Sequence, residues 1–286
     1  MRRLKSEARK AKLECDIVNP VDCQLVIDGK ESRILSRAVP LPKYDAIIPR
    51  IGASITEYGL SVVKHFEMLG VYCVNSSQSI SESRNKMRSL QVLTQAGLQV
   101  PSTVLTRSTY GLRASVDAVK GLPVVLKILQ GTQGVGVMLV HTPVSLGSVL
   151  DTLRTLDQDV IIQQFLVEGA GRDYRVFVVG NRVIATMMRT APKGEFRSNI
   201  HQGGEGNVIQ LPEEYHEAAI RATQVLGLQI AGVDLMESNQ GPMIIEVNSS
   251  PGFEGIEKTT GINVAETVIK HVKKTLREQK RKSVKC

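Results

Sequence analysis

Two apolar strands near the end of the sequence each carry one acid, and this pair constrains the fold more than any other feature. Residues 230–236 read IAGVDLM and residues 243–248 read MIIEVN, with the turn-forming segment ESNQGP between them. This pattern predicts a hairpin. With the turn centred near Gln240, Asp234 and Glu246 lie opposite each other on neighbouring strands, with Cβ atoms about 4.5–5.5 Å apart.

The side chains of Glu246 and Asn248 point to the same face, because strand side chains alternate with period two. Two carboxylates and an amide oxygen then share one patch, which is costly unless a cation lies between them. Oxygen ligands suit Mg²⁺ or Mn²⁺ better than zinc. The alternative is that both acids only rim a solvent-exposed strand end.

A glycine-rich segment, KILQGTQGVGV at 127–137, follows a predicted strand and precedes the apolar run VMLV. No Lys-Ser or Lys-Thr follows the glycines and their spacing differs from the dinucleotide fingerprint, which excludes both motifs. Backbone N–H groups of such a loop can cover phosphates, and a tight turn without a ligand is the alternative. Lys127, just before the loop, could reach a phosphate or could snorkel from an edge strand.

The excess of positive charge is concentrated at the end of the chain. The whole chain carries +8, and its last 17 residues hold eight basic residues and one acid, or +7. The other 269 residues hold 28 basic and 27 acidic residues, or +1. This segment is typical of a solvated helix end. The alternative is an electrostatic arm for ribosomal RNA or an acidic peptide.

The sequence predicts a cytoplasmic enzyme with reduced thiols. No apolar run has the length of a bilayer span, and no apolar segment follows the charged N-terminus, so we expect neither a membrane span nor a signal peptide. The cysteines at 15, 23, 73 and 286 form no C-x-x-C pair, which supports neither a disulfide framework nor a zinc site.

The expected elements alternate helices and strands, which predicts an α+β or α/β fold. Strands are expected at 15–18, 44–52, 71–77, 101–108, 121–129 and 160–166, helices at 54–69, 145–153 and 213–227, a polar hairpin at 24–35 and a second hairpin at 173–189 that turns at Gly180-Asn181. At 286 residues the chain is long enough for two lobes.

Several segments together resemble the RimK family of α-L-glutamate ligases, within the ATP-grasp superfamily, over essentially all of residues 1–272. The segments are PRIGASITEYG, SRNKMRSLQVL, LKILQGTQGVGV, RSNIHQGGEG, AGVDLM and EVNSSPGFEGIEKTTGI. The resemblance implies a pre-ATP-grasp α/β domain over 1–88, an ATP-grasp domain over 89–272 with two lobes and a hinge near 163–173, and a basic tail over 273–286.

The resemblance also assigns roles to individual residues. Asp234, Glu246 and Asn248 match metal ligands, which would hold two Mg²⁺ or Mn²⁺ ions. Arg189 and Arg197 match residues that stabilise charge on the transferring phosphoryl group. The ATP contacts that it implies are Lys86, Lys127, Gly131, Gln133, Gly134, Gly136, Gln164, Phe165, Asp173, Arg197, Ser198 and Asn199.

The reaction implied by the resemblance is the ATP-dependent addition of glutamate to the C-terminal carboxylate of the sixth small-subunit ribosomal protein, through an acyl phosphate. The implied partners are ATP, L-glutamate and that protein tail, with possible ribosome contact through the basic tail and a homo-oligomer, a tetramer, as the assembly. Two alternatives stay open. One is the same chemistry on free oligoglutamate, a cofactor or a small molecule, and the other is a non-catalytic ATP-gated protein that binds the ribosome.

The sequence departs from the family pattern in three places. The first strand of the N-terminal layer is missing ahead of the helix that begins at Met1, for which a mis-called start codon is the expected explanation. Asn85 stands where an acid commonly precedes the lysine, and Gln164 stands where the hinge often has Glu. Both replacements should retune nucleotide contacts without removing them.

Overall fold

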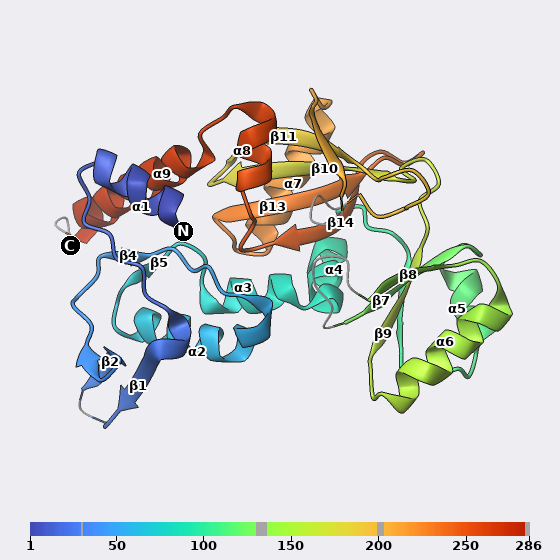
Figure 1. Cartoon of the computed structure of the whole chain (residues 1–286), viewed down its shortest axis with the longest axis horizontal. Helices are drawn as coiled ribbons and strands as arrows, with labels where there is room; N and C mark the ends of the chain where they lie inside the picture. Colours follow the sequence, from blue (N-terminus) through green and yellow to red (C-terminus); the bar gives the residue numbers. More distant parts are fainter. Residues whose placement is uncertain (30, 130–135, 199–202, 284–286) are drawn as a thin grey trace.

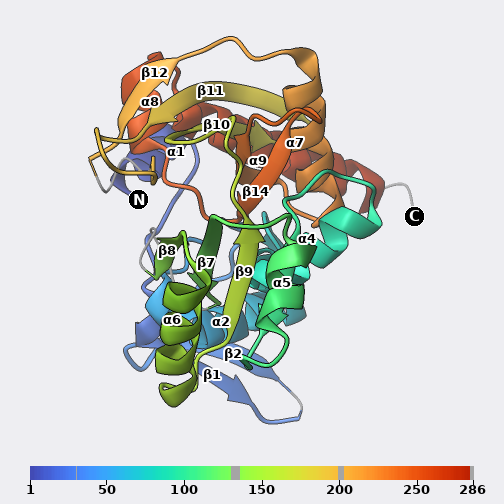
Figure 2. The ribbon, with the colours of Figure 1, turned by 90° about the vertical axis from the view of Figure 1, so that its right-hand side faces the viewer.

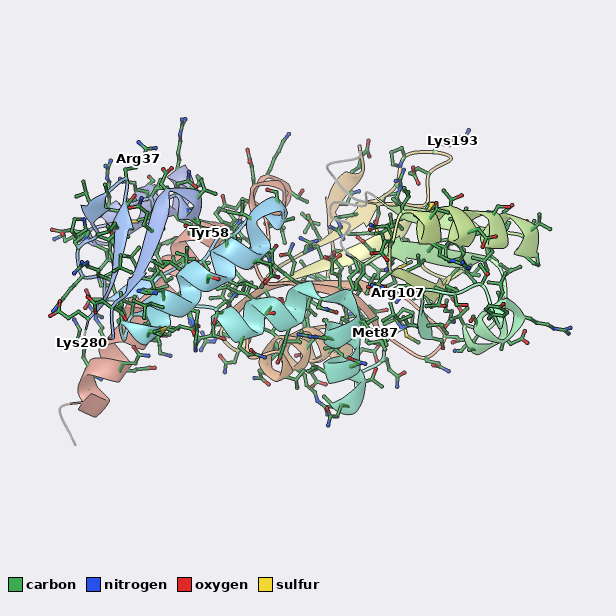
Figure 3. The ribbon with its side chains drawn as sticks, turned by 90° about the horizontal axis from the view of Figure 1, so that it is seen from below. Arg37, Tyr58, Met87, Arg107, Lys193 and Lys280 are labelled. Atoms are coloured by element: carbon green, nitrogen blue, oxygen red, sulfur yellow. The ribbon has the colours of Figure 1, made fainter. Side chains whose placement is uncertain are left out.

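The structure is a computed structural model that describes residues 1–29, 31–129, 136–198 and 203–283. Within these residues the chain forms four sheets, with strand orders β1-β2-β3, β4-β5, β6-β9-β7-β8 and β12-β11-β10-β13-β14. Figure 1 shows the first two sheets at one end, the five-stranded sheet in the middle and the four-stranded sheet at the other end. Seen from below, Arg37 and Lys280 lie near one end of the molecule, and Arg107 and Lys193 lie in the opposite half (Figure 3).

The N-terminal region combines a short parallel strand pair with an antiparallel hairpin. Its elements are α1 (Arg2–Lys10), the 3₁₀ helix η1 (Pro20–Asp22), β1 (Cys23–Ile27), β2 (Ser32–Ser36), β3 (Val39–Pro40), β4 (Ala46–Ile47), the 3₁₀ helix η2 (Ala53–Ile55), α2 (Thr56–Met68), β5 (Tyr72–Cys73), α3 (Ser77–Arg84) and α4 (Lys86–Gln95). The predicted hairpin at 24–35 is confirmed as the β1–β2 pair, and the helix at 54–69 is confirmed as α2.

The strands predicted at 44–52 and 71–77 form, but with only two residues each, as the parallel pair β4–β5. The strand predicted at 15–18 is wrong, since that segment has no strand assignment. Pro20, which has no backbone N–H for a ladder, begins a 3₁₀ turn directly after it.

The four-stranded sheet carries two helices on one face (Figure 2). Its elements are β6 (Thr103–Thr106), α5 (Leu112–Ala118), β7 (Val124–Ile128), β8 (Val137–Val140), α6 (Pro143–Thr155) and β9 (Val160–Gln164). The leucines Leu146, Leu150 and Leu153, which share one face of α6, pack on buried strand residues such as Leu126 and Ile162. Apolar side chains at helical spacing therefore attach α6 to the sheet.

The five-stranded sheet is antiparallel and has two different faces. Its elements and those that follow are β10 (Arg172–Val179), β11 (Arg182–Thr190), β12 (Glu205–Val208), α7 (Glu213–Val225), β13 (Ile230–Met236), β14 (Met243–Asn248), α8 (Glu254–Thr260) and α9 (Val264–Ser283). Tyr174, Val176 and Val178 alternate onto the face covered by α7 and α4. Phe177 and Val179 face the opposite side, where α1, α8 and α9 pack.

The face that carries Phe177 is apolar over only part of its area. By the same alternation, Asp173 and Arg175 on β10 lie on this face. This face therefore carries core side chains and charged side chains on the same strand. The predicted hairpin that turns at Gly180-Asn181 is confirmed as β10–β11, with Gly180 at φ +63°.

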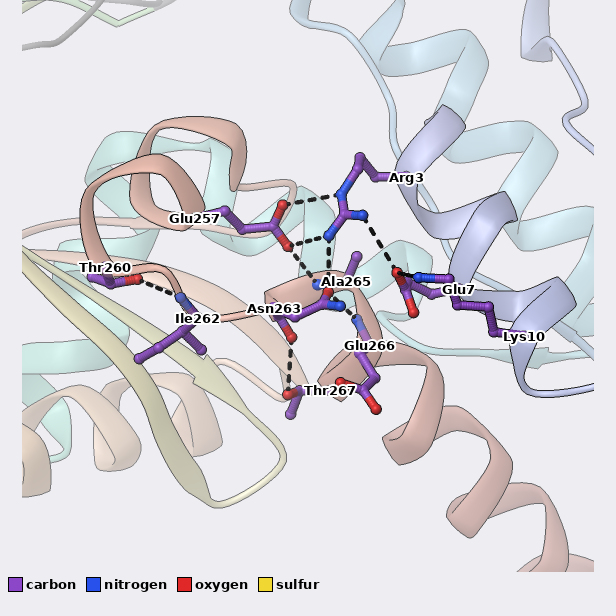
Figure 4. A network of polar contacts seen from close by, with 10 residues as sticks. All are labelled: Arg3, Glu7, Lys10, Glu257, Thr260, Ile262, Asn263, Ala265, Glu266 and Thr267. Carbon is purple, nitrogen blue, oxygen red and sulfur yellow. Dashed lines mark hydrogen bonds and ion pairs between the residues drawn. The ribbon is translucent and has the colours of Figure 1, made fainter.

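The last helix packs along the first. Leu4 and Ala8 of α1 join the same cluster as Val268 and Val272 of α9. Arg3 donates to the Glu257 carboxylate at 3.2 Å and to Asn263 Oδ1 at 3.0 Å (Figure 4). Residues 270–283, which include much of the basic segment, are the last turns of α9. No helix among the described residues is long and apolar enough to cross a membrane.

Candidate active site

Four charged side chains meet on the face of the five-stranded sheet that carries Phe177. The register places Arg175 of β10 directly opposite Asp234 of β13, and Asp173 of β10 directly opposite Arg189 of β11. Asp173 and Arg175 are two residues apart on one strand, so they share a face. The sheet itself therefore brings two acids and two arginines together with alternating sign.

Asp234 is held by both arginines. Arg175 donates from Nε to Oδ1 and from Nη2 to Oδ2 at 2.7 Å, and Arg189 Nη2 lies 2.9 Å from Oδ2. Asp234 is 5% exposed and Arg189 4%. Although burial acts to raise the pKa of Asp234, the two guanidiniums outweigh it and lower that pKa below its usual value. The carboxylate therefore stays charged inside the protein.

Asp173 and Arg189 complete the cluster. Arg189 donates to Asp173 from Nε at 2.6 Å and from Nη2 at 2.5 Å. Burial raises the pKa of Asp173 even though Arg189 opposes the change. Burial also acts to lower the pKa of Arg189, but Asp234 and Asp173 raise it above its usual value. Arg189 therefore remains a fixed positive charge between two carboxylates.

The predicted pairing of Asp234 with Glu246 across the hairpin is confirmed. Glu246 is exposed and Asn248 half-buried, while Val247 between them is buried, so the predicted alternation is also confirmed. Asn248 Oδ1 accepts a hydrogen bond from Ser250 N at 2.8 Å. The alternative that both acids rim a solvent-exposed strand end is wrong for the buried Asp234, whereas Glu246 is exposed on β14 at the edge of the sheet.

The donor set of Asp234, Glu246 and Asn248 fits an oxygen-preferring divalent ion. Three contacts from the two arginines occupy Asp234, and a carboxylate offers about four lone-pair positions, so one position on Oδ1 is left for a metal. The exposed Glu246 carboxylate and the Asn248 amide oxygen add two oxygen ligands. Among the described residues, no group of three or more His, Cys, Asp or Glu side chains could hold a metal ion. This donor set has two such residues, Asp234 and Glu246, and its third ligand is the amide of Asn248.

Lys127, on β7 of the four-stranded sheet, and Lys86, at the start of α4, both lie near Glu246. Lys127 on β7 donates to Gln163 Oε1 at 2.7 Å, and Lys86 at the start of α4 donates to Leu129 O at 3.1 Å. Burial lowers the pKa of Lys127 to about 8, with Glu246 opposing the change. Burial also lowers the pKa of Lys86, again with Glu246 opposing. The two lysines and Glu246 are thus close enough to interact electrostatically.

Gln164 and Phe165 lie at the end of β9, beside an open pocket of about 210 Å³. Gln164 pairs through its backbone N–H with Ser102 O at 2.9 Å, and its side-chain oxygen accepts from Ser102 N at 3.4 Å. The other lining residues are Val119, Lys120, Gly121, Leu122, Pro123, Val167 and Glu168. Neither Lys127 nor Asp173 lines this pocket.

The remaining predicted residues divide into two groups. Gly131, Gln133, Gly134 and Asn199 lie outside the described residues. Gly136 is described, with φ +75°, and a Cβ there would lie 2.9 Å from Ile128 Cδ1, so only glycine fits this close turn. Ser198 is buried, and Arg197 pairs with Glu195 at 2.7 Å. That hydrogen bond lowers the pKa of Glu195 to about 2.

Sequence reasoning missed Arg175 and Gln163. Arg175 follows Asp173 by two positions inside an apolar strand, which places both on one face, and that spacing could have identified it. Gln163 is buried and donates to Thr103 Oγ1 at 2.9 Å while it accepts from Lys127. The sequence indicated its neighbour Gln164 instead, because only the folded structure shows that Lys127 donates to the Gln163 amide.

Solved structures share this fold. They include the ATP-grasp ligase PsnB complexed with minimal precursor, at 19% identity, TM-score 0.74 and coverage of 97% of this chain and 94% of that one. The RimK domain protein ATP-grasp from Sphaerobacter thermophilus matches at 22% identity, TM-score 0.72 and 94% coverage of both chains. D-alanine–D-alanine ligase from Bacillus anthracis complexed with ATP matches at 21% identity and TM-score 0.61, covering 79% of this chain and 78% of that one.

Curated relatives are closer in sequence. The probable alpha-L-glutamate ligase of Picosynechococcus sp. is 44% identical over 273 residues, which is 96% of this chain and 91% of the relative. The probable alpha-L-glutamate ligase of Maridesulfovibrio salexigens is 45% identical over 270 residues, which is 94% of this chain and 90% of the relative.

The fold, the family models and the curated relatives together define an ATP-grasp ligase, which confirms the predicted fold class and the predicted ATP-dependent carboxylate–amine ligase class. Residues 83–272 match the RimK-like ATP-grasp domain and residues 1–80 match the RimK PreATP-grasp domain. The chain belongs to the RimK-like ATP-grasp family, as its motifs predicted.

Proposed function

We propose that this chain is an α-L-glutamate ligase that joins the amine of L-glutamate to a carboxylate acceptor at the expense of ATP. The observation that carries the proposal is the convergence of Lys127 and Lys86 with Asp234, Glu246 and the arginines Arg175 and Arg189. The name that the curated relatives bear, at about 44–45% identity, supports glutamate as the amine substrate.

The cations account for how a carboxylate could approach a polyphosphate. Both reactants are anionic, so fixed positive charges on either side of the transferring phosphoryl group lower their mutual repulsion. Lys127 on β7 and Lys86 at the start of α4 would contact the phosphates, and Arg189 would act from the five-stranded sheet. Arg197, which pairs with Glu195, would join them from the loop after β11.

Asp234, Glu246 and Asn248 would hold magnesium, with manganese as the alternative and two ions as the proposed number. A divalent ion here would neutralise charge on the phosphates. A solved structure of PsnB is a complex with a phosphomimetic precursor variant, Mg and ADP, which supports magnesium. Arg175 would position Asp234 through its two hydrogen bonds.

The nucleotide would lie between the lobes. Gln164 and Phe165 would read the adenine edge beside their pocket, and Asp173, Ser198 and Asn199 would complete the site. The loop that contains Gly131, Gln133, Gly134 and Gly136 would cover the phosphates. The domain boundaries at 88 and 272 and the hinge at 163–173 belong to the same proposal.

The acceptor that we propose is the C-terminal carboxylate of the sixth small-subunit ribosomal protein. Its oxygen would attack the γ-phosphate of ATP, giving an acyl phosphate and ADP, and the glutamate amine would then displace phosphate to form an amide. Solved complexes of PsnB contain precursor peptides, which supports a peptide acceptor. The competing acceptors are free oligoglutamate and a small molecule.

Two finer points belong to the proposal. Basic residues late in α9 would contact the ribosome, and several already have partners, such as Lys280 with Asp45 at 3.0 Å. The assembly would be a homotetramer. A protein that binds ATP and the ribosome without turnover is the non-catalytic alternative.

The test is ADP release measured with and without L-glutamate, in the presence of Mg²⁺ and each acceptor in turn. We expect release that needs both glutamate and the ribosomal protein peptide, and that is lost in Glu246→Gln. Glu237→Gln is the matched control, because Glu237 is a half-exposed acid just past β13 that pairs with Arg172. ADP release that does not depend on glutamate would contradict the proposal. ATP binding without any ADP release would favour the non-catalytic alternative.

A further inference from the structure

A second cationic site lies beside the turn that follows Asn248, where the N-terminal region meets the five-stranded sheet. Arg50 lies in the loop after β4 and donates from Nη1 to Pro251 O at 2.8 Å. Its guanidinium carbon lies 5.5 Å from the centroid of the Phe253 ring. Arg50 therefore reaches from one region of the chain to the segment that carries the candidate metal ligand Asn248.

Most of the donor capacity of Arg50 is unused. A guanidinium has five N–H donors, and among the described residues Arg50 makes one hydrogen bond and no ion pair within 4.0 Å. Burial alone lowers the pKa of Arg50 from its usual value, with no carboxylate to oppose the change. A half-buried cation without an anionic partner carries a desolvation cost, so this arrangement favours binding of an anion.

Arg84 shows how the same fold treats a structural arginine. It is also partly buried, and it donates to Thr56 Oγ1 at 2.7 Å, to Gly52 O at 3.2 Å and to Ile51 O. These three acceptors satisfy both of its terminal nitrogens. The contrast separates Arg50 from an arginine whose role is only to connect loops.

Ser249 supplies a second and independent observation. Its side chain is 3% exposed, and its Oγ is buried with no hydrogen-bond partner among the described residues. Ser250 Oγ is likewise buried without a partner in the described part of the chain. Arg50 and Ser249 line one narrow cavity that has about 10 Å³ for a water-sized group, roughly the room that one oxygen atom needs.

The position of Ser249 is fixed by the N-terminal region. Asn75 donates from Nδ2 to Ser249 O at 2.8 Å and to Ile230 O at 2.8 Å, while its Oδ1 accepts from Gln229 N and Ile230 N. Asn75 thereby uses its full hydrogen-bonding capacity to attach the turn to β13. The unsatisfied Oγ of Ser249 is therefore not a sign of a loose segment.

We infer that Arg50 and Ser249 form a subsite for a carboxylate of the free amino-acid substrate. One carboxylate oxygen would accept a hydrogen bond from Ser249 Oγ–H. Both carboxylate oxygens would accept charge-assisted hydrogen bonds from the unused Arg50 N–H groups. The inference rests on the proposed function and adds to it the residues that hold the amine donor.

The location of Arg50 favours the donor over the acceptor. The acceptor carboxylate must reach the γ-phosphate beside the metal ligands, whereas Arg50 meets the chain at Pro251, three residues past Asn248. L-glutamate reacts through its amine, so both of its carboxylates stay free for binding. A carboxylate at Arg50 would hold the amino acid beside the acyl phosphate without taking part in the reaction.

The test combines L-glutamate binding by calorimetry, with Mg²⁺ and a non-hydrolysable ATP analogue present, with KM values for glutamate and for ATP. In Arg50→Met we expect the glutamate Kd and KM to rise at least thirtyfold, with the ATP KM within threefold of wild type. Ser249→Ala should raise the glutamate KM severalfold. Arg84→Lys is the matched control and should leave the glutamate KM within twofold, and thermal melting checks that each variant is folded.

Substrate analogues make the test specific. 4-Aminobutanoate lacks the α-carboxylate of glutamate, and 2-aminobutanoate lacks the γ-carboxylate. The analogue that lacks the carboxylate bound by Arg50 should bind to wild type and to Arg50→Met with equal affinity. Unchanged glutamate affinity in folded Arg50→Met would overturn the subsite and leave the proposed function standing. If wild type releases ADP with another amino acid instead, the proposed function fails, and the subsite is then judged with that amino acid by the same comparison. If wild type binds no amino acid, the subsite fails as well.

Discussion

Arg175 on β10 lies directly opposite Asp234 on β13 and donates to both oxygens of its carboxylate. The hairpin that pairs Asp234 with Glu246 would otherwise place two acids together. The arginine supplies positive charge on the other side of Asp234, so the protein keeps this acid ionised before any metal or nucleotide is bound. The candidate site is thus partly neutralised by the fold itself.

Arg175→Met should therefore destabilise the protein. Its loss leaves the buried Asp234 with Arg189 as its remaining charged partner, and breaking a buried ion pair costs about 3–5 kcal/mol. The free energy of unfolding in urea measures this change. Arg172→Met is the control, because the Arg172–Glu237 pair is half-exposed and should contribute less than about 1 kcal/mol. Equal effects in the two variants would refute the role given to Arg175.

Lys127 should make nucleotide affinity fall as pH rises. Burial lowers the pKa of this lysine to about 8, so its protonated fraction, which attracts phosphate, is nearly complete at pH 7 and small at pH 9. The Kd for ADP without metal should rise about tenfold between these pH values. Calorimetric titration of ADP at several pH values measures it. Lys127→Arg should flatten the profile, since arginine stays charged throughout, and a wild-type profile that is already flat would exclude Lys127 as a phosphate contact.

Gly232 should be required for the position of Arg175. A Cβ at Gly232 would lie 2.8 Å from Pro251 Cβ and 3.3 Å from Arg175 Cδ. Gly232→Ala should displace the arginine or the turn, and we expect kcat to fall at least tenfold, as measured by ADP release. Gly147→Ala in α6 is the matched control, because its Cβ would meet Leu112 Cδ2 at 3.9 Å, an ordinary contact. If Gly232→Ala had wild-type turnover, the packing of Arg175 against β13 would not matter for catalysis.

Asn75 should hold the N-terminal region on the sheet. Asn75→Ala removes four hydrogen bonds to backbone groups near Ser249 and Ile230, and the groups left without partners should cost about 2–4 kcal/mol in the free energy of unfolding. Chemical denaturation measures the loss. The exposed Asn19→Ala serves for comparison and should cost under about 0.5 kcal/mol. A small loss in Asn75→Ala would mean that other contacts dominate this junction.

Much of the architecture followed from local patterns. The turn-forming segment centred near Gln240 was enough to predict the pairing of Asp234 with Glu246, and the Gly180-Asn181 pair was enough to predict the β10–β11 turn. The family motifs also identified the fold class. Such predictions succeed because strand pairing across a short turn depends on residues close in the sequence.

The rest depends on contacts between distant segments. That Arg175 neutralises Asp234 requires β10 and β13 to be neighbours, although they are 59 residues apart in sequence. The partnership of Arg50 with Pro251 spans 201 residues. The strand expected at 15–18 failed for a related reason, since an apolar run becomes a strand only where another strand accepts its hydrogen bonds.

The central claim is that Asp234 and Glu246, with the cations around them, serve glutamate ligation onto a protein tail. Mass spectrometry of the C-terminal peptide of the sixth small-subunit ribosomal protein, after incubation with the enzyme, ATP, Mg²⁺ and L-glutamate, tests it most directly. The account predicts a series of glutamyl additions that disappears in Asp234→Ala and Glu246→Ala and persists in Glu237→Gln. An unmodified peptide with wild-type enzyme would contradict the proposed acceptor, and additions that persist in Glu246→Ala would contradict the proposed site.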